Sequence, residues 1–200
     1  ILNLLFDRAI ATGKGVRTET RIAFSAVSVS YAAVELVRGM FGELSHSNVL
    51  IFGAGKMAEL TARHLVARGV QKIYVANRHK EKAEVLASYF GGEAVSFEQA
   101  FKQAVDIDIV VTSTGAPHYV VKSWETRQLM TKRKGRPIVF IDIAVPRDVD
   151  PDVAAIKGVT LYNIDDLEEV IDEHVAERRQ EAKLAEKNVS IDAASSQSSF

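Results

Sequence analysis

The stretch VLIFGAGKMA at residues 49–58, followed by IYVANR at residues 73–78, decides the fold. An apolar run leads into a pair of glycines, a helical pattern follows, and a second apolar run ends in Asn-Arg. This order of strand, tight turn, helix and strand is the unit that binds a dinucleotide in open α/β sheets. The sequence therefore predicts a Rossmann-like, doubly wound parallel sheet with a cofactor site at its glycine loop.

Each small residue of the glycine loop is needed for a physical reason. Gly53 allows the tight turn, Gly55 lacks a Cβ so that backbone can approach a pyrophosphate, and Ala58 lets the helix pack on the strand. The free N–H groups at the start of that helix, with the positive end of its dipole, then hold the phosphates. Lys56 either contacts phosphate or is solvated, and the sequence leaves both interpretations open. The predicted cofactor residues of this loop are Gly53, Ala54, Gly55, Lys56, Met57 and Ala58.

The end of the second strand indicates which dinucleotide fits. A free ribose 2′-OH usually meets an Asp or Glu about 20 residues beyond the glycines. Asn77 stands there instead, followed by Arg78, with Lys80 and Lys82 close behind. A carboxylate would repel a 2′-phosphate, whereas Arg78 can pair with one in a bidentate manner. The alternative is that Arg78 is a solvated charge at a strand end. Because the whole motif is present, we favour NADP(H) over NAD(H) and add Asn77, Arg78 and Lys82 to the site.

Composition bounds the other possibilities. The 200 residues are 47% hydrophobic and 26% charged, which is typical of one globular domain, and a net charge of −1 gives no global basic field for nucleic acid. Without cysteine, this chain cannot contain disulfides, Cys-ligated zinc or thiol catalysis, and its five histidines lack metal-like spacing. No secretory signal or membrane-spanning run is visible, so we expect a cytoplasmic protein. The start at Ile1 is expected of a fragment of a longer protein.

Strands and helices alternate from residue 49 onward. The predicted strands are 49–52, 72–76, Val95, 107–113, 138–143 and 159–162. The predicted helices between them are 56–68, 80–90, 97–105 with Ser96 as cap, and 122–133. Near-continuous apolar strands, each followed by a helix, indicate a parallel sheet covered on both faces. The predicted fold is thus α/β, with N-terminal helices at 1–12 and 25–40 and a long, mostly solvated C-terminal helix capped by Asp165 or Asp166.

Two further segments are expected at the carboxyl edge of the sheet, where ligands bind in such folds. Hydroxyls and backbone of Ser113, Thr114 and Gly115 can line the nicotinamide or its ribose, although an ordinary turn explains them equally well. Ala144 and Val145 are suited to flank a flat ring, and Pro146 stiffens their turn. Asp142 lies in an apolar strand and needs a partner; we expect it to satisfy backbone groups. His118 can donate a proton near neutral pH, but a loop histidine is the favoured interpretation.

Several motifs in order resemble the glutamyl-tRNA reductase family, over about residues 1–190. The ten-residue run DIAVPRDVDP at 142–151 is the most specific of them. LYNIDDL at 161–167 has Asn163 where the family often has Asp. The other motifs are RTET at 17–20, AVSVS at 26–30, AAVEL at 32–36, GAGKM at 53–57, NR at 77–78 and STG at 113–115.

This resemblance implies the following organisation and activity. Residues 1–44 are a helical connection from a catalytic domain, 45–163 the NADPH-binding domain, 164–190 part of a spinal dimerisation helix, and 191–200 a disordered tail. In the full-length enzyme, a cysteine of the catalytic domain captures glutamyl-tRNA(Glu) as a thioester, and NADPH reduces it to glutamate-1-semialdehyde for tetrapyrrole (porphyrin and heme) biosynthesis. The implied partners are glutamyl-tRNA(Glu), a second copy of the chain and glutamate-1-semialdehyde aminomutase. No catalytic residue carries over, so this chain should bind NADPH without turnover.

Two alternatives stay open. A shikimate-dehydrogenase-like NADP oxidoreductase also ends its second strand in Asn-Arg, but it needs a substrate domain with a catalytic Lys and Asp upstream. A non-catalytic module that senses NADP(H) would show the same cofactor motif. The sequence of the preceding domain distinguishes these alternatives from the reductase.

Overall fold

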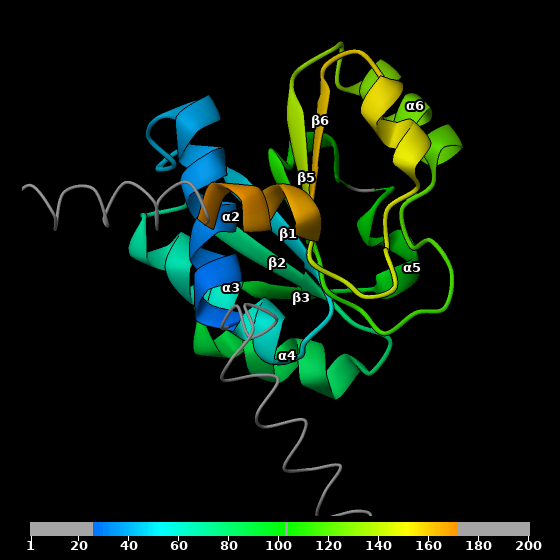
Figure 1. Ribbon diagram of the computed structural model, residues 1–200. Coiled ribbons are helices and arrows are strands. Elements are labelled where there is room, and N and C mark those ends of the chain that lie inside the picture. The colour runs from blue at the N-terminus through cyan, green and yellow to red at the C-terminus, as the bar shows by residue number, and fades with distance from the viewer. Residues whose placement is uncertain (1–25, 103, 172–200) are drawn as a thin grey trace, which may run out of the picture.

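Six parallel strands form one sheet in the order β3-β2-β1-β4-β5-β6 (Figure 1). The computed structural model describes residues 26–102 and 104–171, with side chains from residue 29 onward. The strands are β1 Asn48–Phe52, β2 Lys72–Ala76, β3 Glu93–Val95, β4 Ile109–Thr112, β5 Ile138–Asp142 and β6 Val159–Asn163. The predicted Rossmann-like α/β fold is confirmed, and the order reverses direction between β1 and β4.

The central strands are apolar except at their ends, because both faces of the sheet are covered. Alternate side chains of each strand point to opposite faces. Val49 and Ile51 of β1 therefore belong to one core cluster, whereas Leu50 and Phe52 belong to the other. Every residue of β4 and β5 is buried, which accounts for the uninterrupted apolar runs in the sequence.

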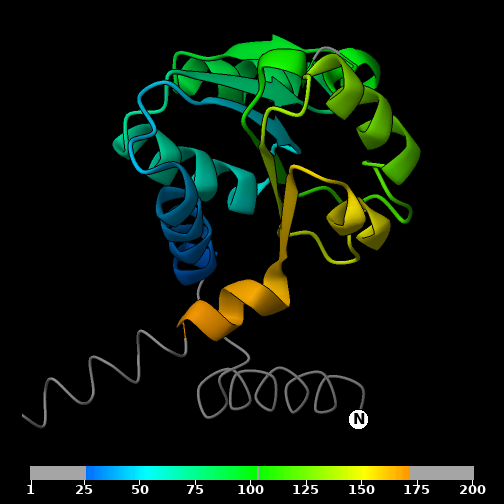
Figure 2. The same ribbon diagram turned by 90° about the horizontal axis from the view of Figure 1, so that it is seen from above.

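The helices divide between the two faces. The first core cluster is covered by α2 Ala26–Phe41, α3 Lys56–Ala67 and α4 Lys80–Tyr89. The second is covered by α5 Phe97–Ala100, the 3₁₀ helices η2 Ala104–Asp106 and η3 Pro151–Ala155, and α6 Ser123–Lys132. Figures 1 and 2 both show α2 lying beside α3. Because α2 shares the core of the sheet, the predicted domain boundary between residues 44 and 45 is not marked by a break in packing, and it stays a prediction.

Ser96 is the N-cap residue of α5, as predicted, but its hydroxyl donates to Glu98 Oε2 at 2.8 Å and makes no capping bond to the helix backbone. The predicted cap of the C-terminal helix is wrong. The C-terminal helix, described over residues 164–171, has Asn163 as its cap in place of the predicted Asp165 or Asp166. Asn163 Oδ1 accepts from Asp165 N at 2.8 Å, and Asp166 Oδ2 accepts from Asn163 N at 2.7 Å. This reciprocal pair is a variant of the capping box, in which the N-cap side chain accepts from the second helical residue in place of the third.

Other element boundaries differ in instructive ways. The predicted helix 97–105 is split into α5 and η2, and the predicted strand 107–113 is shortened to β4. Helix η3 was not expected, although its signals are local: Pro151 occupies its first position, and Asp150 accepts from Asp152 N at 3.0 Å. The C-terminal helix inserts Leu167 into the first core cluster. The predicted helix 1–12, the continuation of the C-terminal helix past 171 and the tail 191–200 lie outside the described residues.

Within the described part, no helix is both long and apolar enough to cross a bilayer.

A buried arginine joins η2 to the end of α6. Arg133 donates to the backbone carbonyls of Ala104, Val105 and Ile107, to that of Arg136 at 3.2 Å and to that of Pro137 at 2.6 Å. Burial lowers its pKa, and the nearby charge of Arg136 lowers it further. The rigid fork of the guanidinium serves several carbonyls at once, which a lysine ammonium cannot do.

We therefore expect Arg133→Lys to reduce the free energy of unfolding by about 2 kcal/mol, because carbonyls that it now satisfies stay buried without a donor. Urea unfolding of the variant measures this loss. Arg127→Lys, at an exposed position of the same helix, is the control and should change stability by less than about 0.5 kcal/mol. Equal effects of the two substitutions would contradict the capping role of Arg133.

Candidate dinucleotide site

A cavity of about 340 Å³ lies over the carboxyl ends of β1, β2 and β4, where the strand order reverses. Its volume is within the range of about 300–1,000 Å³ typical of small-molecule sites. Nine of the residues predicted from the sequence line it: Gly53, Ala54, Gly55, Asn77, Arg78, Lys82, Ser113, Thr114 and Gly115. His79, Phe97 and Ala116 complete the lining. The fold thus brings the nine predicted residues together from three segments, 53–55, 77–82 and 113–115, that are far apart in the sequence.

Gly53 is required for two independent reasons. Its φ is +105°, in the region that favours glycine. A Cβ at this position would lie 2.2 Å from the backbone oxygen of Ser113. Its own N–H donates to Ala76 O at 2.9 Å. The residue therefore fits only as glycine between the ends of β2 and β4.

Gly55 is the N-cap residue of α3. Unlike Gly53, it has room for a side chain, because no atom lies within 4 Å of a Cβ built at this position. The space beside it is open from the cavity, as expected where a ligand approaches the first turn of a helix. Ala58 is fully buried and Met57 is partly buried against the first core cluster. These two predicted residues serve helix packing and do not line the cavity.

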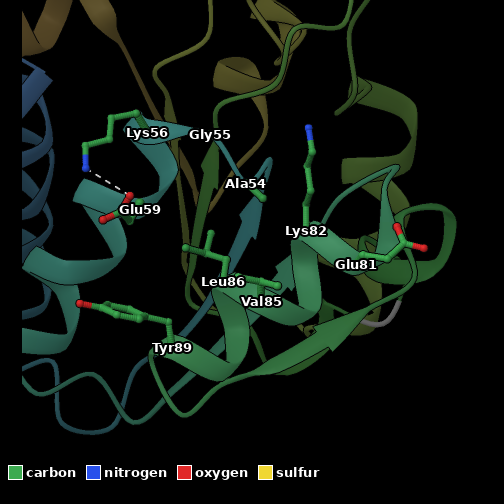
Figure 3. Close-up of a pocket in the computed structure, with 9 residues that line it drawn as sticks. All are labelled: Ala54, Gly55, Lys56, Glu59, Glu81, Lys82, Val85, Leu86 and Tyr89. Atoms are coloured by element: carbon green, nitrogen blue, oxygen red, sulfur yellow. Dashed lines mark hydrogen bonds and ion pairs between the residues drawn. The ribbon is translucent and has the colours of Figure 1, made fainter.

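Lys56 points away from the cavity. Its ammonium lies 3.2 Å from Glu59, which also pairs with Arg63 at 3.0 Å. The hydrogen bonds from Arg63 and Lys56 lower the pKa of Glu59. Figure 3 shows Lys56 turned along α3 toward Glu59, whereas Lys82 extends alone from the start of α4. Of the two predicted lysines, Lys82 is therefore the one available to the cavity.

A larger groove of about 570 Å³ runs between α3 and α4 (Figure 3). It shares Ala54, Gly55 and Lys82 with the cavity and is otherwise lined by helix side chains, among them Val85 and Tyr89, which are 72% and 63% exposed. The groups suited to recognise a dinucleotide lie at the strand ends and line the smaller cavity. We therefore place the candidate site in the smaller cavity.

Arg78 forms the wall of the cavity at the end of β2. Its guanidinium carbon lies 5.7 Å from the centre of the Phe97 ring, and its Nη2 lies 3.4 Å from Nε2 of His118. A guanidinium has no acceptor, so a hydrogen bond at this contact requires His118 Nε2 to accept. Lys80 pairs with Glu84 at 3.4 Å and does not line the cavity. Arg78 and Lys82 are thus the cations of the lining.

The loop after β4 is held by an acid that is not among the residues predicted from the sequence. Thr114 donates to Asp148 twice, from its N–H to Oδ2 at 2.7 Å and from its hydroxyl to Oδ1 at 2.5 Å. The same hydroxyl accepts from Ala116 N at 3.1 Å. The sequence offered little signal, because Asp148 stands between Arg147 and Val149 in the run 142–151, yet it is fully buried.

Asp142 satisfies backbone groups, as predicted. It accepts from the N–H groups of Ala144, Asp148 and Val149 at 3.2, 3.0 and 2.9 Å. It also accepts from the hydroxyl of Thr112 at 2.9 Å. Asp142 thereby fixes the loop that carries Asp148.

The ionisation of Asp148 should oppose folding. Burial raises its pKa, the bonds from Thr114 act against this rise, and the charge of Asp142 adds to it. An acid whose pKa is higher in the folded than in the unfolded state binds its proton more tightly when folded. Its contribution to the free energy of unfolding is therefore lost as pH rises from the unfolded value of about 3.9 through the raised pKa.

Asp148→Asn removes this titration. We expect its stability relative to the unmodified chain to increase as pH rises from about 4 to 7. Urea unfolding at several pH values measures the difference. Asp106→Asn, at an exposed acid 3.7 Å from Arg136, controls for the loss of one negative charge. A constant difference between Asp148→Asn and the unmodified chain would contradict the assignment.

Ala144, Val145 and Pro146 follow β5, at the same edge of the sheet, because Thr112 of β4 pairs with Asp142 of β5. They do not line the cavity. Ala144 is buried, whereas Val145 is 77% exposed. Their contact with a nicotinamide ring stays a prediction.

Comparison with known proteins agrees with this geometry. The family described as Shikimate / quinate 5-dehydrogenase matches residues 35–170. A glutamyl-tRNA reductase of Nitratidesulfovibrio vulgaris is 51% identical over 185 residues, which are 92% of this chain and 42% of that protein. The chain thus spans less than half the length of this relative.

Solved structures give the same result. The glutamyl-tRNA reductase from Methanopyrus kandleri is 44% identical, with a TM-score of 0.75, and the match covers 93% of this chain and 47% of that one. The nucleotide-binding domain of a glutamyl-tRNA reductase from Thermoplasma volcanium shares the fold at 19% identity and a TM-score of 0.58, over 78% of this chain and 96% of that one. The chain therefore belongs to the family described as Shikimate / quinate 5-dehydrogenase, and its homologues at about half identity are glutamyl-tRNA reductases.

Proposed function

We propose that this chain is the NADPH-binding part of a glutamyl-tRNA reductase. The whole protein would reduce glutamyl-tRNA(Glu) to glutamate-1-semialdehyde in tetrapyrrole biosynthesis, which supplies porphyrins and heme. The observation that carries the proposal is the cavity at the switch point, where Asn77 stands in place of an acid and Arg78 and Lys82 line the cavity together with the glycine loop. The identity of about 50% to glutamyl-tRNA reductases supports the choice of reaction.

The residues present fit a bound NADPH. The open space at Gly55 leaves room for the pyrophosphate at the first turn of α3, where free N–H groups and the helix dipole favour an anion. Arg78 would bind the 2′-phosphate, with Lys82 adding charge. The loop 113–116 forms the opposite wall. NADPH supplies the hydride for the reduction when it is bound, and the residues of this chain bind and orient it.

The nucleophile of the proposed reaction is not in this chain, which contains no cysteine. Covalent capture of the ester as a thioester divides a difficult reduction into two steps. We propose that a cysteine in another part of the longer protein performs the first step. This chain alone should therefore bind NADPH and leave glutamyl-tRNA unchanged.

The family match favours a second candidate, a shikimate-dehydrogenase-like NADP oxidoreductase, because residues 35–170 match the family described as Shikimate / quinate 5-dehydrogenase. The identity of 51% to a glutamyl-tRNA reductase over 92% of the chain argues for the first candidate. Incubation with shikimate and NADP⁺ discriminates between them, and we expect no reduction of NADP⁺. If this chain is instead part of a module that only senses NADP(H), the longer protein that contains it would not reduce glutamyl-tRNA.

The same proposal includes the domain organisation and the partners. Residues 1–44 would connect to a catalytic domain, 45–163 would bind NADPH, 164–190 would belong to a dimerisation helix, and 191–200 would form a disordered tail. A cytoplasmic homodimer that passes its aldehyde to glutamate-1-semialdehyde aminomutase completes the account. The described start of the helix, with Leu167 buried in the core, supports a rigid joint between the second and third parts.

The experiment that tests the proposal is a parallel titration of the 200-residue chain with NADPH and NADH by calorimetry. We expect NADPH to bind more tightly, and the chain alone to show no turnover of glutamyl-tRNA. Failure to bind NADPH would overturn the assignment of the cavity. Turnover by the chain alone would overturn the division of roles between this chain and the missing nucleophile.

A further inference from the structure

We propose that Asp148 is a positioning residue of the cofactor site: its carboxylate, which does not line the cavity, fixes Thr114 and thereby the loop 113–116 against which NADPH binds. The inference rests on the function proposed above and deepens it. It assigns a role to a buried acid that lies 34 residues from its partner in the sequence.

The hydrogen bonds lead from Asp148 directly to the cavity wall. Both carboxylate oxygens accept from Thr114, one from the backbone N–H and one from the hydroxyl. The hydroxyl in turn accepts from Ala116 N. Thr114 and Ala116 both line the cavity, whereas Asp148 does not. One carboxylate therefore determines both the backbone position and the rotamer of Thr114, and through them the shape of the loop.

Asp148 is itself held rigidly from three sides. Its N–H donates to Asp142 at 3.0 Å. Its carbonyl accepts from Val120 N at 2.7 Å and from Val121 N at 3.0 Å. The next residue, Val149, forms a parallel bridge with Val121. A group fixed in this way can hold a loop in one geometry, which is what a binding site needs from the residues behind its first layer.

Stability alone does not explain a carboxylate at this position. In the described part of the chain, no Lys, Arg or His forms an ion pair with Asp148, and the second buried acid, Asp142, lies close to it. A buried charge without a paired cation is costly, and a neutral asparagine of similar shape would avoid that cost. Residues that break such local rules are expected at functional sites. Arg78, across the cavity, is the cation whose charge favours the ionised form of Asp148.

A double-mutant cycle on NADPH binding tests the inference. The dissociation constant is measured for the unmodified chain, for Asp148→Asn, for Thr114→Val and for the double variant. Thr114→Ser retains the hydroxyl and serves as the rescue. Thr126→Val is the matched control, because Thr126 is buried and its hydroxyl donates to Lys122 O at 3.0 Å, in α6 away from the cavity. Urea unfolding of every variant at the same pH gives the accompanying change in stability.

If the inference holds, Asp148→Asn and Thr114→Val each weaken NADPH binding by about tenfold, at the lower end of the value of a hydrogen bond to a charged group. The double variant is then no weaker than the worse single variant by more than about twofold, because both substitutions remove the same contact. Thr114→Ser and Thr126→Val stay within about twofold of the unmodified chain. Asp148→Asn also loses no more free energy of unfolding than Thr126→Val, so its weaker NADPH binding is not a consequence of lower stability.

Two results would overturn the inference while leaving the proposed function intact. One is an unchanged dissociation constant in Asp148→Asn, and the other is fold-changes of the two single variants that multiply in the double variant. An unmodified chain that does not bind NADPH would overturn the proposed function and this inference with it.

Discussion

Replacing Arg78 with alanine is expected to weaken NADPH binding by about 10- to 100-fold and to leave NADH binding nearly unchanged. The two cofactors differ only in the 2′-phosphate, and Arg78 lies at the end of β2, where the ribose of a bound dinucleotide is recognised. Its guanidinium is solvent-exposed on one side and supported by Phe97 and His118 on the other. It can therefore form a bidentate pair with the phosphate without rearranging the cavity.

Lys80→Ala is the matched control for this prediction. Lys80 is two residues from Arg78 and carries the same charge, but it pairs with Glu84 and does not line the cavity. We expect its removal to change NADPH affinity by no more than about twofold. Equal losses for NADPH and NADH in Arg78→Ala, or an equally large loss in Lys80→Ala, would mean that Arg78 supplies only a general positive charge.

Gly53→Ala is expected to reduce the free energy of unfolding by about 3–5 kcal/mol, from strain at a positive φ and from overlap with backbone that cannot rotate away. The added Cβ would lie 2.2 Å from Ser113 O and 2.8 Å from Ser113 C. Relief of this overlap requires β1 and β4 to separate at their carboxyl ends. The variant should therefore also lose NADPH binding, because Ser113 and Thr114 line the cavity.

Gly55→Ala separates stability from binding at the same loop. Its Cβ meets no atom within 4 Å, so the free energy of unfolding should fall by less than about 1 kcal/mol, the usual cost of alanine at a helix N-cap. NADPH binding should nevertheless weaken, since the open space beside Gly55 is where the pyrophosphate is proposed to lie. Urea unfolding and calorimetric titration of both variants measure these effects. A stable Gly53→Ala variant, or normal NADPH binding by Gly55→Ala, would contradict the account of the loop.

The fold and the cavity floor could be predicted from the sequence because their signals are local. Strand 72–76 is found at the predicted residues, and the glycine loop lies where an apolar run of strand length meets two glycines. The pairing of Lys56 with Glu59 is also local, since residues three apart on a helix are neighbours. This contact favours Lys56 as a surface cation of α3, and its contact with phosphate stays a prediction.

Contacts between distant segments could not be predicted in the same way. Thr114 and Asp148 meet only because β4 and β5 pair in a register that aligns Thr112 with Asp142. Arg133 reaches carbonyls that precede it by 26 to 29 residues. In the sequence, Thr114, Asp148 and Arg133 look like ordinary polar residues in a loop or a helix, and the partners of Arg133 are backbone carbonyls of apolar residues. Their roles depend on burial and orientation, which a single sequence does not encode locally.

A crystal structure of this chain with NADPH tests the central claim most directly, because the cavity and the groove between α3 and α4 are neighbours that share Gly55 and Lys82. The account predicts the 2′-phosphate within hydrogen-bonding distance of Arg78, the pyrophosphate at the first turn of α3, and the loop 113–116 against the nucleoside. NADPH bound along Val85 and Tyr89 in the groove, or a 2′-phosphate remote from Arg78, would contradict it.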